Sequence, residues 1–232
     1  MNIEQIRING FAIATNIIEP DMIAQICQDV AIVNTIEVGS QSRQSTYGIR
    51  NILNIPSIRA LANCDCIRKL VEPILGKQAI PVRGILFDKT PTANWKVAWH
   101  QDLTIAVREK IDVSGFNAWS VKAGIVCVQP PVFVMENILT IRLHLDDTSE
   151  TNGALKVLPS SHCHGRMSVE EIQAWKQKAI AVTCNVPRGG VLVMRPLLLH
   201  ASSVALNPSS RRVLHLEYSA IALPRGLEWY GT

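Results

Sequence analysis

This 232-residue chain lacks several sequence features that are typical of particular classes of protein. No stretch comes near the ~20 consecutive apolar residues of a transmembrane helix, so we expect no membrane partner. The N-terminal sequence MNIEQIRINGFAIATNII lacks the basic start and long apolar core of a secretory signal peptide, so we expect a cytoplasmic protein. The net charge is +4, but no run of basic residues occurs, and the sequence gives no support for nucleic-acid binding.

Motifs for nucleotide and zinc sites are missing too. Gly189 and Gly190 precede a β-rich run, and no P-loop or G-x-G-x-x-G pattern leads from a strand into a helix. Of the six cysteines, only Cys64 and Cys66 are close, and no second C-x-x-C pair accompanies them. This spacing argues against a structural zinc site. We expect all the cysteines to be reduced thiols, as is usual in the cytoplasm.

The composition is that of a folded protein with a large core. Hydrophobic residues make up 47% of the chain and charged residues 18%, which excludes global disorder. Residues 20–31 and 64–75 have the pattern of amphipathic helices, the first begun by Pro20 and Asp21 and the second ended by Gly76. Residues 39–57 show no clear period, and we expect them to be irregular.

From about residue 80, short β-rich runs replace the helices. Each run is bounded by Pro, Gly, Asn or Asp, and their regular spacing indicates a sandwich or barrel. One helix is expected among them, over 168–178, because Ser168 and Glu171 form a capping-box pattern. We therefore predict a single domain over 1–232 that is mainly β with flanking α-helices. Its N-terminal helical and irregular part, 1–79, would pack on a β core at 80–232.

The sharpest local pattern is Trp99-His100-Gln101-Asp102. Side chains alternate along a strand, so His100 and Asp102 would point the same way and could supply two ligands to one metal ion. A further histidine, His200, ends the apolar run VLVMRPLLLH. Two histidines and one carboxylate, with the other metal positions open, form the facial triad of non-haem Fe(II) oxygenases. An H-x-D pair alone is weak support, because it is more often a surface or hydrogen-bonding pair.

An arginine beyond His200 strengthens this interpretation. Arg211 follows His200 by eleven residues, which fits a strand, a turn and the start of a neighbouring strand. Its guanidinium could return beside the metal and bind the distal carboxylate of 2-oxoglutarate through two parallel hydrogen bonds. Arg212 is the competing candidate. Alternation puts Arg211 on the face of His215 and Glu217, which is the more polar face and better suits a pocket, so we favour Arg211.

With these residues, the sequence resembles the phytanoyl-CoA dioxygenase family of Fe(II)- and 2-oxoglutarate-dependent oxygenases. The resemblance lies in the order and spacing of several blocks between about residue 80 and 218. These are FDKTPTANW and WHQD (87–102), LTIRLHLDD (139–147), NGALKVLPSSH (152–162), GGVLVMRPLLLHASS (189–203) and NPSSRRVLHLEY (207–218). One small departure is Pro-Ser-Ser-His at 159–162, where the family often has Pro-Gly-Ser-His.

The resemblance implies a double-stranded β-helix, or jelly-roll, core with the site at its open end. The implied iron ligands are His100, Asp102 and His200. The implied 2-oxoglutarate residues are Arg211, Ser202, Gln101 and Trp119. For Trp119, a place in the aromatic core is an equal alternative. Arg142 and His144 are candidates either for the substrate pocket or for a buried polar network.

The implied activity is oxidation of an unactivated C–H bond of a small molecule. The implied cofactors are Fe(II), 2-oxoglutarate and O2, with ascorbate supportive in vitro and succinate and CO2 released. Asp102 favours hydroxylation, desaturation or ring formation over halogenation, because halogenating relatives lack this carboxylate. The alternatives are a non-enzymatic jelly-roll protein that binds a metal or ligand, or a cupin-type dioxygenase without 2-oxoglutarate. We expect a monomer or homodimer, and the fold does not identify the substrate.

Overall fold

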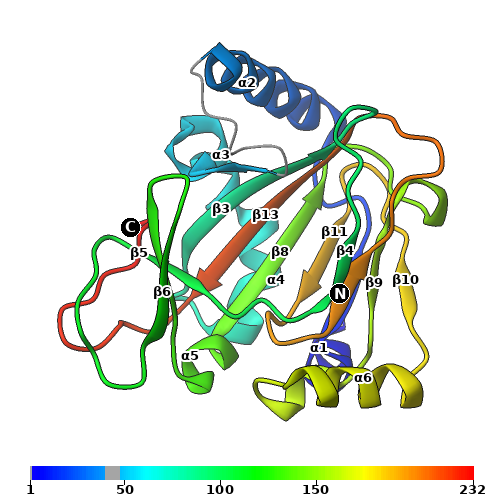
Figure 1. Cartoon of the computed structure of the whole chain (residues 1–232). Helices are drawn as coiled ribbons and strands as arrows, with labels where there is room; N and C mark the ends of the chain where they lie inside the picture. Colours follow the sequence, from blue (N-terminus) through cyan, green and yellow to red (C-terminus); the bar gives the residue numbers. More distant parts are fainter. Residues whose placement is uncertain (1, 40–47) are drawn as a thin grey trace.

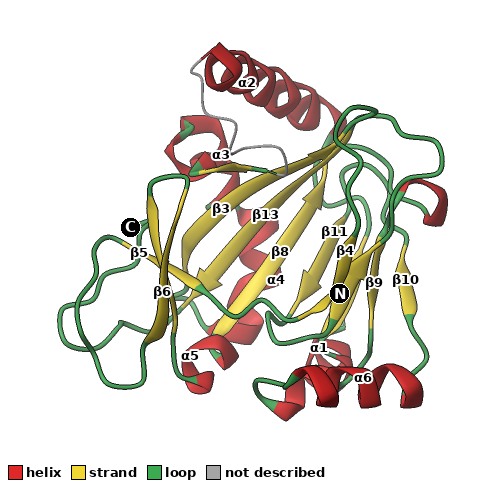
Figure 2. Cartoon of the chain, in the orientation of Figure 1, coloured by secondary structure: helices red, strands yellow, loops and turns green. Residues whose placement is uncertain are grey.

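The computed structural model describes residues 2–39 and 48–232, whose strands form three antiparallel sheets (Figures 1 and 2). The largest sheet has the order β1 (Phe11–Ala14), β11 (Val191–Met194), β8 (Ile138–His144), β13 (Arg211–Ser219), β3 (Ile80–Lys89) and β2 (Ile49–Arg50). The second has the order β10 (Val182–Cys184), β9 (Leu155–Val157), β12 (His200–Ser202) and β4 (Val97–His100). The third consists of β5 (Ile105–Val107), β7 (Ile125–Gln129) and β6 (Asn117–Lys122). The prediction of a mainly β protein with flanking helices is confirmed.

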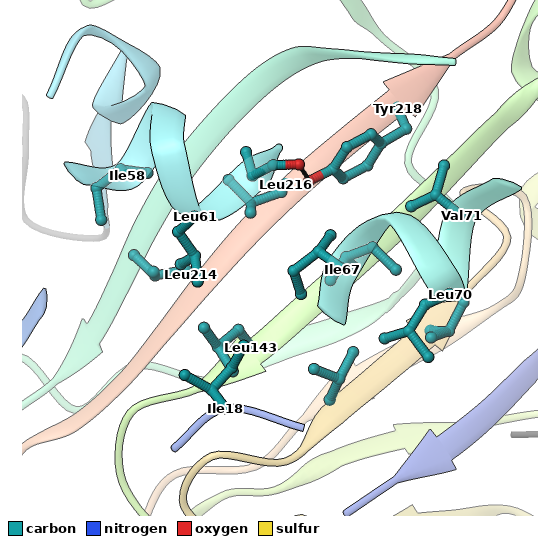
Figure 3. Packing of buried hydrophobic residues seen from close by; sticks show 14 of the residues in the cluster. Ile18, Ile58, Leu61, Ile67, Leu70, Val71, Leu143, Leu214, Leu216 and Tyr218 are labelled. Atoms are coloured by element: carbon teal, nitrogen blue, oxygen red, sulfur yellow. Dashed lines mark hydrogen bonds between the residues drawn. The ribbon is translucent and has the colours of Figure 1, made fainter. Parts of the chain in front are cut away.

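Helices cover one face of the six-stranded sheet. They are α2 (Pro20–Gly39), α3 (Pro56–Ala62) and α4 (Asp65–Leu75). Buried leucine and isoleucine side chains from α3 and α4 pack against β8 and β13 in the main hydrophobic cluster (Figure 3). Tyr218 joins this cluster, and its buried hydroxyl donates a hydrogen bond of 2.8 Å to the carbonyl oxygen of Ala62. The opposite face of the sheet is therefore free to build a site.

The remaining helices lie at the edges of the sheets. They are α1 (Ile3–Asn9), α5 (Val132–Glu136) and α6 (Val169–Lys178), with 3-10 turns at Ile52–Asn54, Glu150–Asn152 and Ser161–His164. The capping box predicted for α6 is confirmed, since Ser168 and Glu171 exchange both hydrogen bonds. Among the helices that the structure describes, none has the length and apolar character needed to span a membrane.

The helix boundaries differ from the prediction in the N-terminal part. The helix predicted at 20–31 continues to Gly39, while the one predicted at 64–75 is α4, ended by Gly76 with a φ of +90°. Within the stretch expected to be irregular, residues 40–47 lie outside the described residues, and α3 begins at Pro56. A proline fits the first turn of a helix because its missing N–H has no partner there, which explains this helix start.

Two short strands also come from the part that was predicted to be helical and irregular. β1 forms the edge of the six-stranded sheet against β11, and β2 forms its other edge against β3. Their length explains the omission, because runs of two to four residues carry almost no periodic signal. The N-terminal part thus contributes two strands to the same sheet as the later part of the chain.

The prediction that every cysteine is a free thiol is wrong for one pair. Cys64 and Cys66 form a disulfide at the start of α4, with their Cα atoms 5.5 Å apart. The turn into the helix brings the two residues within the usual span of such a bond. Four other cysteines are free thiols: Cys27, Cys127, Cys163 and Cys184.

Candidate active site

Neighbouring segments bring His100, Asp102 and His200 together. His100 and His200 pair across β4 and β12, and their ring centroids lie 4.2 Å apart. Asp102 follows the end of β4, where its backbone N–H donates to the carbonyl oxygen of Pro196. One ligand atom from each side chain lies within 4.8 Å of the other two. The Asp102 carboxylate oxygens lie 3.8 Å from Nε2 of His100 and 3.7 Å from Nε2 of His200.

The backbone orients both imidazoles toward the shared centre. Nδ1 of His100 lies 2.9 Å from the carbonyl oxygen of Ala98, and Nδ1 of His200 lies 2.8 Å from that of Leu198. A carbonyl only accepts, so each Nδ1 carries the proton and donates it. Each Nε2 is left with a lone pair that faces the carboxylate, which is the arrangement seen for metal-binding histidines.

Burial and charge favour the protonation states that bind a cation. Burial lowers the pKa of His200 to about 4, which keeps its ring neutral at physiological pH. Burial alone would raise the pKa of Asp102, but the surrounding histidines and the guanidinium of Arg83 lower it below its usual range. An anionic carboxylate and neutral imidazoles are the donors that a first-row metal ion requires. The three side chains therefore fit such an ion.

A cavity of about 360 Å³ opens beside these three residues, between the six-stranded and four-stranded sheets. Its volume falls within the range of about 300–1,000 Å³ that is usual for small-molecule sites. Strand alternation explains the wall from the large sheet, since residues 83, 85, 87 and 89 of β3 all line the cavity. From β13, the lining residues are Arg211, His215 and Glu217.

One end of the cavity carries a buried polar network around Gly153. Arg211 donates to the Gly153 carbonyl oxygen at 2.8 Å, and the Ser202 hydroxyl donates to the same oxygen at 2.9 Å. Lys89 donates to the Ser202 hydroxyl at 2.8 Å and to the Ser203 carbonyl oxygen. A side chain at position 153 would meet Ser203 and Lys89, and its φ of +78° favours glycine. We call Lys89, Ser202 and Arg211 the inner cluster.

The structure separates the two competing arginines. Arg212 points away and makes a two-bond ion pair with Asp146, at 2.7 and 2.8 Å. Arg211 lines the cavity, where burial and the charge of Arg142 lower its pKa to about 10. Its buried Nε has no hydrogen-bond partner among the described residues, so this donor is available to a ligand. The alternation used to favour Arg211 describes β13 correctly.

The other predicted site residues divide into two groups. Gln101 lines the cavity, but its side chain is engaged by the backbone, donating to Gly165 and Leu197 and accepting from Met167. Arg142 also lines the cavity, 2.8 Å from Nδ1 of His215.

Trp119 and His144 are not among the residues that line this cavity. Trp119 packs against the hydrophobic cluster that contains Leu223, with Lys110 Nζ 5.9 Å from its ring. His144 is buried, with Nδ1 3.1 Å from the hydroxyl of Thr148. The positions favour the core alternative for Trp119 and the buried-network alternative for His144.

Sequence reasoning missed several charged residues of the cavity wall, namely Arg50, Arg83, Lys89 and Lys122. Two of them, Arg83 and Lys89, share the inward face of β3 with Ile85 and Phe87. The alternation of VRGILFDK could have found this pair. Arg50 and Lys122 lie at strand ends, where the sequence has no period to follow.

A family comparison matches residues 6–213 to the model described as phytanoyl-CoA dioxygenase (PhyH). The chain belongs to the phytanoyl-CoA dioxygenase family. None of the curated proteins compared with it matches. The match begins at residue 6, well before the first block noticed in the sequence, and includes α2, α3 and α4, which confirms the predicted resemblance. Family membership also supports the predicted cofactors, iron and 2-oxoglutarate.

Solved structures agree on the fold. The chain is similar to AviO1 from Streptomyces viridochromogenes Tue57 (TM-score 0.70, 22% identity, covering 96% of this chain and 95% of that one). It is similar to SnoK, a non-heme alpha ketoglutarate dependent carbocyclase from nogalamycin biosynthesis (TM-score 0.71, 14% identity, 94% and 82% covered). It is also similar to EctD from S. alaskensis with bound Fe (TM-score 0.67, 18% identity, 94% and 75% covered). These likenesses confirm the predicted double-stranded β-helix core.

Proposed function

We propose that the protein is an Fe(II)- and 2-oxoglutarate-dependent oxygenase that oxidises a C–H bond of a small molecule, with release of succinate and CO2. The observation that carries the proposal is the convergence of His100, Asp102 and His200 at a cavity whose inner end holds Arg211. Family membership supports the same reaction class. Neither the fold nor the triad alone would distinguish an enzyme from a binding protein.

The three proposed ligands leave open positions for the reactants. Iron(II), when bound, would supply the activation of O2. His100 and His200 would each contribute Nε2, fixed in direction by the Nδ1 contacts with Ala98 and Leu198. Asp102 would contribute one negative charge, and a carboxylate here favours hydroxylation, desaturation or ring formation over halogenation. The backbone contacts hold the two histidine rings in this orientation.

The inner cluster has the chemistry to hold the distal carboxylate of 2-oxoglutarate. Arg211 offers a guanidinium whose Nε is unused, and guanidinium groups bind carboxylates in a two-bond geometry. Lys89 adds a second positive charge beside it, and Ser202 adds a hydroxyl. Such a site has no counterpart in a cupin-type dioxygenase without this co-substrate, so Arg211 favours the 2-oxoglutarate reaction over that alternative.

Succinate release tests the proposal. Purified protein supplied with Fe(II), ascorbate and 2-oxoglutarate is expected to release succinate, and His100→Ala to abolish the release. Arg211→Gln is expected to weaken calorimetric 2-oxoglutarate binding by at least about tenfold, because a charge-assisted pair is worth 1.5–3 kcal/mol or more. Arg212→Gln is the matched control, with the same change on the other face of β13. Metal binding without any affinity for 2-oxoglutarate would overturn the proposal.

A further inference from the structure

Positive charge gathers at two separate places in the cavity. Lys89 and Arg211 pair across β3 and β13 in the inner cluster. Farther along the same two strands, Arg83 pairs with Glu217. Lys89 and Arg83 are six positions apart on β3, which corresponds to about 20 Å of strand. A five-carbon diacid such as 2-oxoglutarate is far shorter than this, so one such molecule cannot occupy both places.

The second place is built by three cations from three strands, and we call Arg50, Arg83 and Lys122 the outer cluster. Arg50 of β2 pairs with Ile85, which puts it on the cavity face beside Arg83. Lys122 ends β6 and lines the same cavity. Burial lowers the pKa of both Arg50 and Lys122, and the charge of Arg83 lowers each further. The three charges are therefore close enough to repel one another.

Two members of the outer cluster have no ion-pair partner at contact distance among the described residues. Arg83 donates to Glu217 at 3.3 Å and to the Thr104 carbonyl oxygen at 3.0 Å, so its charge is compensated. The side chains of Arg50 and Lys122 make no hydrogen bond or ion pair within residues 2–39 and 48–232, although Glu217 attracts Arg50 and Asp102 attracts Lys122 from farther away. Glu217 cannot serve them fully, because it also lies 3.1 Å from Nε2 of His215. A partly buried cation without a partner is costly, and an anionic ligand would relieve that cost.

The charge of the whole cavity leads to the same conclusion. Six cationic side chains line it, against the two carboxylates of Asp102 and Glu217. The charges of iron(II) and 2-oxoglutarate cancel, so a loaded site would keep its positive excess. Beside the outer cluster, Ile85 and Leu103 provide apolar wall for a carbon skeleton. A neutral or cationic substrate would leave the excess in place.

We propose that Arg50 and Lys122 bind a negatively charged group of the substrate, a carboxylate or a phosphate, and so hold the rest of the molecule toward the triad. The substrate class is thus a small organic anion. This inference rests on the proposed function, which assigns the inner cluster to 2-oxoglutarate. It also gives the two ends of the cavity different ligands, although both are anions.

Calorimetric titration of small anions tests the inference. Hexanoate and inorganic phosphate are titrated separately, without O2, into protein loaded with Fe(II) and saturating 2-oxoglutarate. Wild-type protein is expected to bind at least one of them, and the tighter probe identifies the group as carboxylate or phosphate. Arg50→Gln and Lys122→Gln should each weaken that binding about tenfold or more, the usual loss for a charge-assisted contact. Lys178→Gln, on exposed α6, makes the same charge change elsewhere and should bind as wild type.

Two results would overturn the inference, namely no binding of either probe to the wild type, and equal binding to the wild type and both variants. Arg50→Lys keeps the charge and should retain most of the binding, which separates loss of charge from misfolding. If Arg50→Gln weakened 2-oxoglutarate as much as Arg211→Gln does, the outer cluster would belong to the co-substrate, and the inference would fail.

Failure of the proposed function itself would look different. In that case the wild type would not bind 2-oxoglutarate at all. The anion titrations would then be repeated on an Arg211→Gln background, in which the inner cluster is weakened. If adding Arg50→Gln or Lys122→Gln to that background abolished anion binding, the outer cluster would still be an anion site. Only its role in the oxygenase reaction would be lost.

Discussion

The two faces of the six-stranded sheet differ sharply in chemistry, although the same strands build both. On β13, Leu214, Leu216 and Tyr218 point to the helices and belong to the main hydrophobic cluster. Their neighbours His215 and Glu217 point to the cavity and are equally buried. A strand alternates its side chains with a period of two, so one nine-residue strand serves both environments.

This difference indicates how the protein divides stability from binding. Apolar burial on the helix face stabilises the fold by about 25 cal/mol for each Å² removed from water. On the cavity face, the buried charges are desolvated, and their mutual attraction need not offset that cost. We therefore expect the helix face to hold the fold together and the cavity face to lower its stability in exchange for ligand binding.

The largest expected effect is on the helix face. Leu216→Ala should lower the free energy of unfolding by about 2–5 kcal/mol, because it removes a fully buried side chain and leaves a cavity. Denaturant unfolding measures this change. Leu206→Ala is the matched control, since Leu206 is 73% exposed and its loss should change stability by less than about 0.5 kcal/mol. Equal losses in the two variants would contradict the assignment of the core to this face.

The next effect concerns Lys89 on the cavity face, and it depends on pH. Burial and the charge of Arg211 lower the pKa of Lys89 to about 8, from 10.5 for an unburied lysine. Between these values the unfolded chain binds more protons than the folded protein, so this group makes stability rise with pH, by at most about 1.4 kcal/mol per pH unit. Below pH 8 the cost of the buried charge is fully present.

Comparison with Lys89→Met isolates this contribution. Burial raises the pKa of the Cys184 thiol to about 12, so that thiol makes stability fall with pH over part of the same window, but in both proteins alike. The unfolding free energy of the wild type, minus that of Lys89→Met, should rise between pH 8 and 10.5 and level off above it. A difference that stays flat over this window would show that Lys89 titrates like an exposed lysine.

The same contrast explains how much of the molecule could be predicted from its sequence. Periodic runs such as those of β8 and β13 were found because one face is apolar along the whole strand. The candidate metal ligands His100 and Asp102 were noticed because they are two positions apart in a strand-like pattern, and Arg211 because alternation separates it from Arg212. Each of these patterns is local in the chain, whereas His200 joins His100 and Asp102 only through the pairing of β12 with β4.

The features that were not predicted depend mainly on pairing between distant segments of the chain. The two-residue strand that carries Arg50 becomes part of the cavity only through its pairing with β3. Lys122 reaches the same cavity from the third sheet, which no local pattern connects to the first. The disulfide between Cys64 and Cys66 also depends on the exact turn into α4, and a C-x-C spacing alone does not determine it.

The smallest expected effect tests whether the cavity face does lower stability. Arg142 is buried beside His215, and its Nε has no hydrogen-bond partner in the described part of the chain. Replacing such a charge by an apolar side chain of similar length removes the desolvation cost, so Arg142→Met should raise the free energy of unfolding by about 1 kcal/mol. Denaturant unfolding at pH 7 without ligands would measure it. Arg212→Met is the control, since Arg212 is satisfied by Asp146 and its loss should lower stability instead. If Arg142→Met were the more destabilising of the two, Arg142 would stabilise the fold. The cavity face would then contribute to stability as well as to ligand binding.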